Sequence, residues 1–153
     1  MAKNTNRRFF LAGIIQGSIL TPDIHPQDYR ERIRSVLRDA FPDVEVYCPI
    51  ENHPESLTYR DDYAIKVFFE HVQMAGESEA LIAFLPEASM GTAVEMWVAH
   101  EGAVPVVTIS PMKENWTVRF LSDVILPDMD AFEEYVHSGA LQRLIENRPE
   151  SEG

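Results

Sequence analysis

A stretch near the middle of the chain joins an apolar run to a helical pattern through a short break. Residues 80–85 read Ala-Leu-Ile-Ala-Phe-Leu, the break covers 86–91, and apolar side chains at helical spacing continue to His100. A continuous apolar run of this length is typical of a strand buried on both faces, as in parallel sheets. Ligands of open parallel sheets bind beyond the carboxyl ends of the strands. The break is therefore expected to border a ligand site.

Apolar segments alternate with amphipathic ones along the rest of the chain. Because each parallel connection needs a crossover, this alternation predicts a sheet covered by helices on both faces. We expect an α/β fold: a single flavodoxin-like (Rossmann-like) domain with a five-stranded parallel sheet in the order 2-1-3-4-5. Besides 80–85, the expected strands cover 8–15, 44–49, 103–109 and 124–126, and the expected helices cover 26–40, 60–77, 92–100, 115–123 and 129–145.

The length of 153 residues suits one domain with a conventional core. We expect that domain to cover residues 8–146, between a flexible N-terminus at 1–7 and a flexible tail at 147–153. Within it, the loop that follows the first strand should face the 86–91 break across the point where the strand order reverses.

The charge of the chain excludes several kinds of partner. Its formal net charge is -12 and its pI is near 4.7, so nucleic acid polymers and anionic membrane surfaces are not expected as partners. No apolar stretch approaches the length that spans a membrane, and the short run Phe9 to Ile15 leads straight into the fold. The single cysteine, Cys48, has no partner for an internal disulfide. These features indicate a cytoplasmic protein.

Several motifs of cofactor and metal chemistry are missing. The sequence has no Gly-Lys-Ser/Thr phosphate loop, no dinucleotide fingerprint and no Gly-x-Ser-x-Gly elbow, and its five histidines lack zinc spacing. No cofactor and no metal are therefore expected. What remains is a site rich in carboxylates, which suits chemistry at a sugar carbon through an oxocarbenium-like state. Glu95, just beyond the 86–91 break, is the best placed acid.

Two residues near this break each have two interpretations. Thr92 to Glu95 matches a capping box, in which Glu95 only satisfies a backbone amide at the helix start. Alternatively, Glu95 is a nucleophile that the helix dipole keeps ionised. Ser89 is either a loop hydrogen-bonder or, together with nearby helix amides, an anion contact.

Three segments together resemble a known family. They are the first strand with its Gly13 loop, the run Ser78-Glu79-Ala80-Leu81-Ile82-Ala83-Phe84, and Gly91-Thr92-Ala93-Val94-Glu95. They resemble the nucleoside 2-deoxyribosyltransferase superfamily, which includes the 2'-deoxynucleoside 5'-monophosphate N-glycosidases, and the resemblance spans roughly Phe9 to Phe132. It implies a flavodoxin-like fold and Glu95 as the nucleophile that takes the sugar from its base.

The resemblance also implies which residues contact the substrate. Six residues before the glutamate, transferases carry an aspartate and the monophosphate glycosidases a phosphate-binding serine, and this chain has Ser89. The glycosidases also carry an arginine in the first loop, where this chain has Gln16. Gly13, Gln16, Ser89 and Gly91 are thus expected to bind substrate. A nucleoside monophosphate is expected to bind better than its nucleoside.

Two further positions follow from the same resemblance. A second catalytic acid falls at Glu70 or His71, with Glu70 ranked first, although a solvated helix face is the alternative for Glu70. Asn115 resembles the asparagine that transferases contribute to a neighbouring subunit, which implies a homo-oligomer with shared active sites. Apart from the resemblance, His53 lies in a polar loop from which it would contact a base, although polar loop residues are usually only solvated.

These residues predict an enzyme that acts on a small nucleoside or nucleotide. It would cleave or transfer the N-glycosidic bond of a (deoxy)nucleoside or its 5'-monophosphate through a covalent glycosyl-enzyme on Glu95. The alternative is a non-catalytic nucleotide-binding or sensing module of the same fold, because a fold does not by itself imply turnover.

Overall fold

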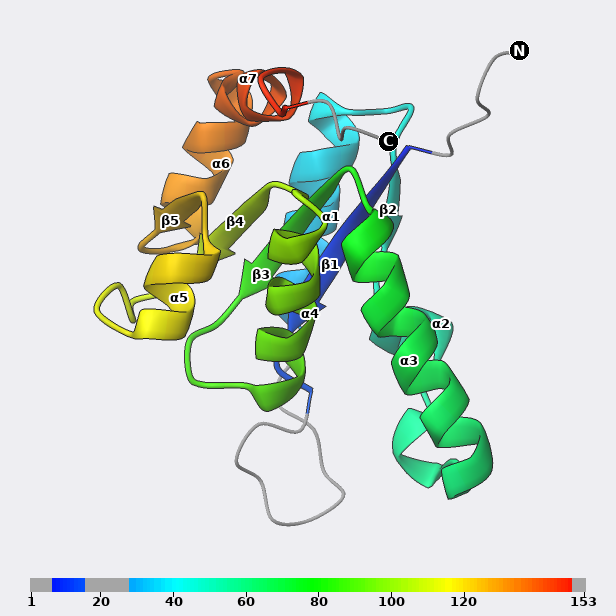
Figure 1. The fold of residues 1–153 in the computed structure, drawn as a ribbon. Helices are drawn as coiled ribbons and strands as arrows, with labels where there is room; N and C mark the ends of the chain where they lie inside the picture. The colour runs from blue at the N-terminus through cyan, green and yellow to red at the C-terminus, as the bar shows by residue number, and fades with distance from the viewer. Residues whose placement is uncertain (1–6, 16–27, 150–153) are drawn as a thin grey trace.

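The computed structural model describes residues 7–15 and 28–149. Its centre is a parallel sheet in the order β2-β1-β3-β4-β5 (Figure 1). This confirms the strand order and the fold class expected from the sequence. The strands are β1 (Arg8–Gly13), β2 (Glu45–Tyr47), β3 (Ala80–Phe84), β4 (Val106–Ile109) and β5 (Val124–Leu126).

Helices cover both faces of the sheet because alternate side chains of its strands point to opposite faces. The helices that pack on the sheet are α1 (Asp28–Ala40), α3 (Asp61–Glu77), α4 (Met90–Glu101), α5 (Trp116–Leu121), α6 (Met129–His137) and α7 (Ala140–Glu146). In β1, Phe9 and Leu11 pack with α1, α6 and α7, whereas Phe10 and Ala12 pack with α3, α4 and α5. All four of these side chains are buried.

The chain after β2 differs from the expected strand and loop. The strand expected at 44–49 ends at Tyr47, and Pro49 begins the short helix α2 (Pro49–Asn52). Proline is favoured in the first turn of a helix, since it has no amide hydrogen to lose there. A 3-10 turn, η1 (Ser56–Thr58), follows and brings this segment back toward α3.

The prediction of a single final helix at 129–145 is wrong in one respect, because the helix is interrupted between α6 and α7. Gly139 has a φ of 82°, a left-handed conformation that ends a helix and suits glycine. The Ser138 hydroxyl then accepts a hydrogen bond from the Ala140 amide at 3.3 Å. Apolar periodicity did not reveal the break, since Phe132 before it and Leu141 after it pack into one core.

No helix among the described residues is both long and apolar enough to cross a bilayer.

Candidate active site

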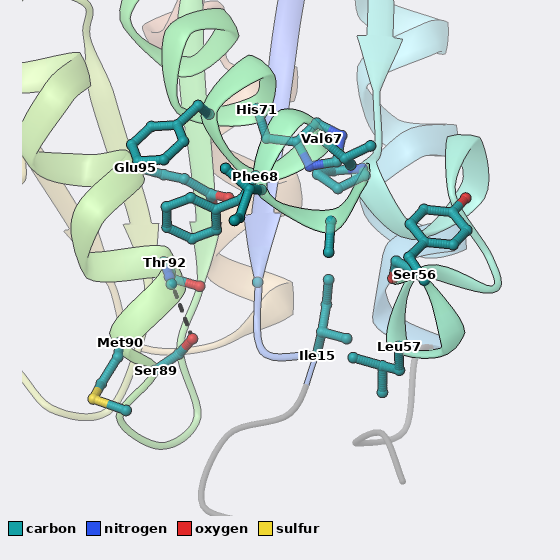
Figure 2. Close-up of a pocket in the computed structure, with 17 residues that line it drawn as sticks. Ile15, Ser56, Leu57, Val67, Phe68, His71, Ser89, Met90, Thr92 and Glu95 are labelled. Carbon is teal, nitrogen blue, oxygen red and sulfur yellow. Dashed lines mark hydrogen bonds between the residues drawn. The ribbon is translucent and has the colours of Figure 1, made fainter. Parts of the chain in front are cut away.

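A cavity of about 520 Å³ opens at the carboxyl edge of the sheet, as expected for this topology. The end of β1, the α2–η1 segment, α3 and the first turns of α4 form its walls (Figure 2). The cavity brings together several residues singled out in the sequence, although they are far apart along the chain. Those that line it are Gly13, Ser89, Gly91 and Glu95, together with Thr92 and His71.

Ser89, rather than Thr92, is the N-cap of α4. The Ser89 hydroxyl accepts a hydrogen bond from the Thr92 amide at 3.3 Å, and the helix begins at Met90, two residues earlier than expected. The capping-box interpretation of Thr92 and Glu95 is therefore wrong. Glu95 lies in the second turn of α4, so its carboxyl does not cap the helix.

The charge state of Glu95 also differs from the expectation. Burial raises the pKa of its carboxyl to about 8, although the positive charge of Arg30 opposes that rise. The helix dipole acts mainly within the first turn, so it does not compensate for desolvation at this depth. At neutral pH the Glu95 carboxyl is therefore mostly protonated.

Arg30 and Tyr29 of α1 lie near enough to Glu95 to interact with it electrostatically, although neither lines the cavity. Sequence reasoning did not single them out as site residues. The Arg30 side chain is 3% exposed, and its guanidinium donates hydrogen bonds to the Gly13 carbonyl at 3.4 Å and to Cys48 Sγ at 3.1 Å. In the sequence, Arg30 is one of several charged residues in an amphipathic helix. Nothing there distinguishes it from its solvated neighbours.

Tyr29 explains why residue 13 is a glycine. A Cβ added at Gly13 would overlap the Tyr29 hydroxyl, which donates to the Ile14 carbonyl at 3.4 Å. The Tyr29 ring stacks on Phe84, with ring centroids 4.0 Å apart. Burial raises the pKa of Tyr29 to about 12, so its hydroxyl stays protonated at neutral pH.

The α4 end of the cavity offers polar groups but no cationic side chain among its described lining residues. The Thr92 side chain is 2% exposed, and its Oγ1 has no hydrogen-bond partner within the described ranges. Gly91 is exposed, and a Cβ there would meet nothing within 4 Å, so packing does not require a glycine at that position. Anion binding at this end would thus depend on α4 backbone amides and hydroxyls.

The two candidates for a second catalytic group lie differently with respect to the cavity. His71 lines it, and its Nε2 is 3.0 Å from the Tyr47 hydroxyl. Glu70 is exposed, lies outside the lining and has its Oε1 3.8 Å from Lys66 Nζ. Adjacent residues of a helix point about 100° apart, and sequence spacing alone did not show which of the two faces the cavity.

His53 and Asn115 lie outside the cavity lining of their own chain. His53 contacts Tyr59, which lines the cavity. The Nδ1 atom of His53 lies 3.1 Å from the Tyr59 hydroxyl. Asn115 caps α5 by accepting the Val118 amide hydrogen bond at 3.2 Å. Gln16 lies outside the described residues. The described part of the chain holds no group of three or more His, Cys, Asp or Glu side chains that could bind a metal ion.

The fold and the site together define a doubly wound, flavodoxin-like protein with a cavity where the strand order reverses. No protein-family model matches the sequence, and no curated protein matches it. Solved structures do match the fold. A 2-deoxyribosyltransferase from Bacillus psychrosaccharolyticus superposes with a TM-score of 0.61 at 21% identity, covering 84% of this chain and 91% of that one.

Two further structures have the same architecture. A conserved protein from Enterococcus faecalis has a TM-score of 0.57 at 20% identity, covering 86% of this chain and 98% of its own. A CMP N-glycosidase from Clostridium botulinum has a TM-score of 0.51 at 17% identity, with the same two coverages. At these identities the likeness is one of fold, and it confirms the fold implied by the resemblance to the nucleoside 2-deoxyribosyltransferase superfamily.

Proposed function

We propose that this protein is an enzyme that cleaves or transfers the N-glycosidic bond of a (deoxy)nucleoside or its 5'-monophosphate. The observation that carries the proposal is the position of Glu95 in the cavity wall, at the sheet edge where such a substrate would bind. The activities of two structural neighbours, a 2-deoxyribosyltransferase and a CMP N-glycosidase, support the same class of chemistry.

In the proposed mechanism, the ionised Glu95 carboxylate attacks the anomeric carbon. The C1'–N bond breaks, and its electron pair leaves with the base. Water or a second base then attacks the glycosyl ester, which restores the starting configuration and frees Glu95. Because its pKa is about 8, Glu95 must lose a proton first, and the buried charge of Arg30 favours that loss.

The rest of the cavity suits a nucleoside. Its volume of about 520 Å³ falls in the usual range for small-molecule sites, and Leu57, Val67 and Phe68 contribute apolar walls. Such walls exclude water, which strengthens the electrostatic interactions of a developing oxocarbenium ion with Glu95. Gly13, Ser89 and Gly91 are proposed to contact the sugar side, and Gln16 to contribute from the first loop.

The proposal includes the assembly and the location of the protein. Asn115 is proposed to complete the site of a neighbouring subunit, because it lies outside the cavity of its own. Trp116 beside it is 74% exposed, as expected for a residue that a second copy covers. A cytoplasmic location, suggested by the lone Cys48, is part of the same proposal.

The decisive experiment measures free base and the covalent intermediate together. The protein is incubated with matched nucleosides and 5'-monophosphates, released base is separated by chromatography, and quenched protein is digested for mass spectrometry. A sugar adduct on the peptide containing Glu95, absent from Glu95→Gln, is the expected result. Binding without base release from any member of the panel would favour the non-catalytic module instead.

A further inference from the structure

We propose that Arg34 of α1 is a positioning residue, which holds the α2–η1 wall of the cavity in place through Glu51 and so sets the affinity for the substrate. The inference rests on the proposed function, since its effect is measured on the substrate of that reaction. Neither Arg34 nor Glu51 lines the cavity, so their action on a ligand is indirect.

The α2–η1 wall is built from a segment with little stability of its own. Helix α2 has four residues and η1 has three. Isolated helices this short are not stable in water, so tertiary contacts must decide where the segment lies. Ser56 and Leu57 of this segment line the cavity, and they lie across it from Glu95 (Figure 2). A shift of the segment would therefore change the shape of the cavity.

Helix α1 holds the start of this segment with two arginines that lie one turn apart. The Arg30 guanidinium donates to the sulfur of Cys48, the residue before α2, and Arg34 forms an ion pair with Glu51 of α2. Both arginines are buried. Ile50 of α2 adds apolar packing against the core on the α1 face of the sheet. Because Arg30 also acts on the proposed nucleophile, Arg34 is the arginine that can test the wall by itself.

The surroundings of Arg34 make the link to α2 important. A buried charge is costly unless a group of opposite charge compensates it, and removal of such a partner leaves the charge uncompensated. Among the described residues, two carboxylates pair with Arg34: Glu51, and Glu31 of α1, whose Oε2 lies 3.2 Å from Arg34 Nη1. The Nε of Arg34 has no hydrogen-bond partner in the same part of the chain. Glu31 shares its helix with Arg34, so only the pair with Glu51 ties α1 to the wall.

Loss of this link should weaken binding more than chemistry. Glu95 lies on α4, which packs on α3 and on the sheet. Displacing α2 should therefore leave the Glu95 carboxyl in place. Contacts that a substrate makes with the wall, far from the reacting carbon, are equally strong before and in the transition state. Losing such contacts raises KM and leaves kcat unchanged.

The test measures KM and kcat for base release by four variants. Arg34→Met keeps the apolar stem and removes the charge, whereas Glu51→Gln removes the carboxylate. Each should raise KM about tenfold and change kcat by less than about threefold, the size expected for one coupled pair. The double variant, Arg34→Met with Glu51→Gln, should have a KM no higher than either single variant, because both changes remove the same interaction. Arg34→Lys keeps a charge and should recover part of the affinity.

Glu31→Gln is the matched control, since it removes the other carboxylate from Arg34 and leaves the link to α2 intact. Its KM should stay within about twofold of the unaltered protein. Hydrogen exchange supplies a readout that needs no substrate. In Glu51→Gln, backbone amides of residues 49–59 should exchange faster, whereas those of residues 89–95 should keep their protection.

An unchanged KM in Glu51→Gln would overturn the inference, as would a loss confined to kcat or an equal rise of KM in Glu31→Gln. If Arg34→Met does not fold, Glu51→Gln decides between these outcomes, because its side chain is partly exposed. If the unaltered protein releases no base from any nucleoside or monophosphate, the proposed function itself fails. The exchange measurement then tests the link between α1 and the wall, and unchanged exchange at residues 49–59 would overturn it.

Discussion

Glu95, the proposed nucleophile, has two competing requirements. The proposed attack needs its carboxylate form, yet desolvation raises its pKa to about 8 and favours the neutral form. Arg30 is the nearby cation that opposes this effect, and it is itself buried behind Gly13. The balance between desolvation of Glu95 and the charge of Arg30 would therefore set the pH at which the proposed reaction begins.

The first prediction concerns the pH dependence of base release. Because only the carboxylate attacks, kcat/KM should rise with pH and level off above about pH 8. At pH 6 roughly one carboxyl in a hundred is ionised, so the rate should be about 100-fold below the plateau. Arg30→Gln should move the midpoint to higher pH, since it removes the favourable charge. A rate that is flat from pH 6 to pH 9 would contradict this assignment.

The second prediction concerns the stability of Glu95→Gln. The folded pKa of about 8 exceeds the ordinary value of 4.5, so the folded state binds the proton more tightly and wild-type stability falls as pH rises between these values. Glutamine resembles the protonated acid. The variant should match the wild type near pH 4.5 and be more stable at pH 8 by on the order of 1 kcal/mol, since the side chain is partly accessible.

Urea unfolding at both pH values measures this difference. Glu101→Gln, an exposed substitution in the last turn of the same helix, is the control and should show no comparable gain. The same Glu95→Gln protein should release base about a thousandfold more slowly or worse, because an amide cannot attack the anomeric carbon. Lower stability of Glu95→Gln at both pH values would mean that the carboxylate supports the fold.

At the scale of elements, the N-terminus of α4 has two roles. Its first turn is capped by Ser89, and the same turn borders the cavity with its amides and with the Thr92 hydroxyl, which has no hydrogen-bond partner among the described residues. Unsatisfied amides at a helix start attract anions. The sequence-based expectation that a 5'-monophosphate binds better than its nucleoside therefore depends on this turn.

The third prediction separates the cap from the anion contact. Ser89→Ala should cost about 1 kcal/mol of stability, because it removes the cap. Ser89→Asp should keep the cap and the stability, but its negative charge should weaken monophosphate binding at least tenfold and leave nucleoside binding unchanged. Calorimetric titration with matched nucleosides and monophosphates measures both affinities. Equal affinity of Ser89→Asp and wild type for the monophosphate would place the phosphate elsewhere.

At the scale of the whole molecule, the exposed aromatic surface on α5 has no partner within the described chain. Trp116 and Phe120 are both exposed, with ring centroids 5.8 Å apart, and Asn115 precedes them as the cap of the helix. Exposed aromatic side chains of this kind are common at subunit contacts. The position of this surface agrees with the proposal that Asn115 acts in a neighbouring subunit.

The fourth prediction is that inactive subunits complement each other. Asn115→Ser keeps a capping side chain but shortens it, so base release should fall about tenfold or more without unfolding α5. Mixing Asn115→Ser with Glu95→Gln subunits and allowing exchange should restore activity, because some mixed sites contain both native residues. Light scattering that finds a fully active monomer, or mixtures no more active than their components, would contradict shared sites.

The sequence by itself determined the architecture of this protein. Alternating apolar and amphipathic segments allow few arrangements once crossovers must be right-handed, so the strand order followed from local patterns. The same patterns placed Ser89 and Glu95 at the carboxyl end of β3, where parallel sheets bind ligands. The sequence did not determine where helix α4 begins or where the last helix is interrupted. Ser89 and Thr92 both suit a helix start, and Gly139 interrupts a continuous apolar stripe.

Only the tertiary structure decided the chemistry around those residues. Whether His71 or Glu70 reaches the cavity depends on how α3 is rotated about its axis against its neighbours. The sequence pattern does not determine that rotation to within one residue. Arg30 approaches Gly13 through packing between segments distant in sequence, and no local signal marks it. The raised pKa of Glu95 likewise arises from burial among several elements, because desolvation depends on everything that surrounds a carboxyl in space.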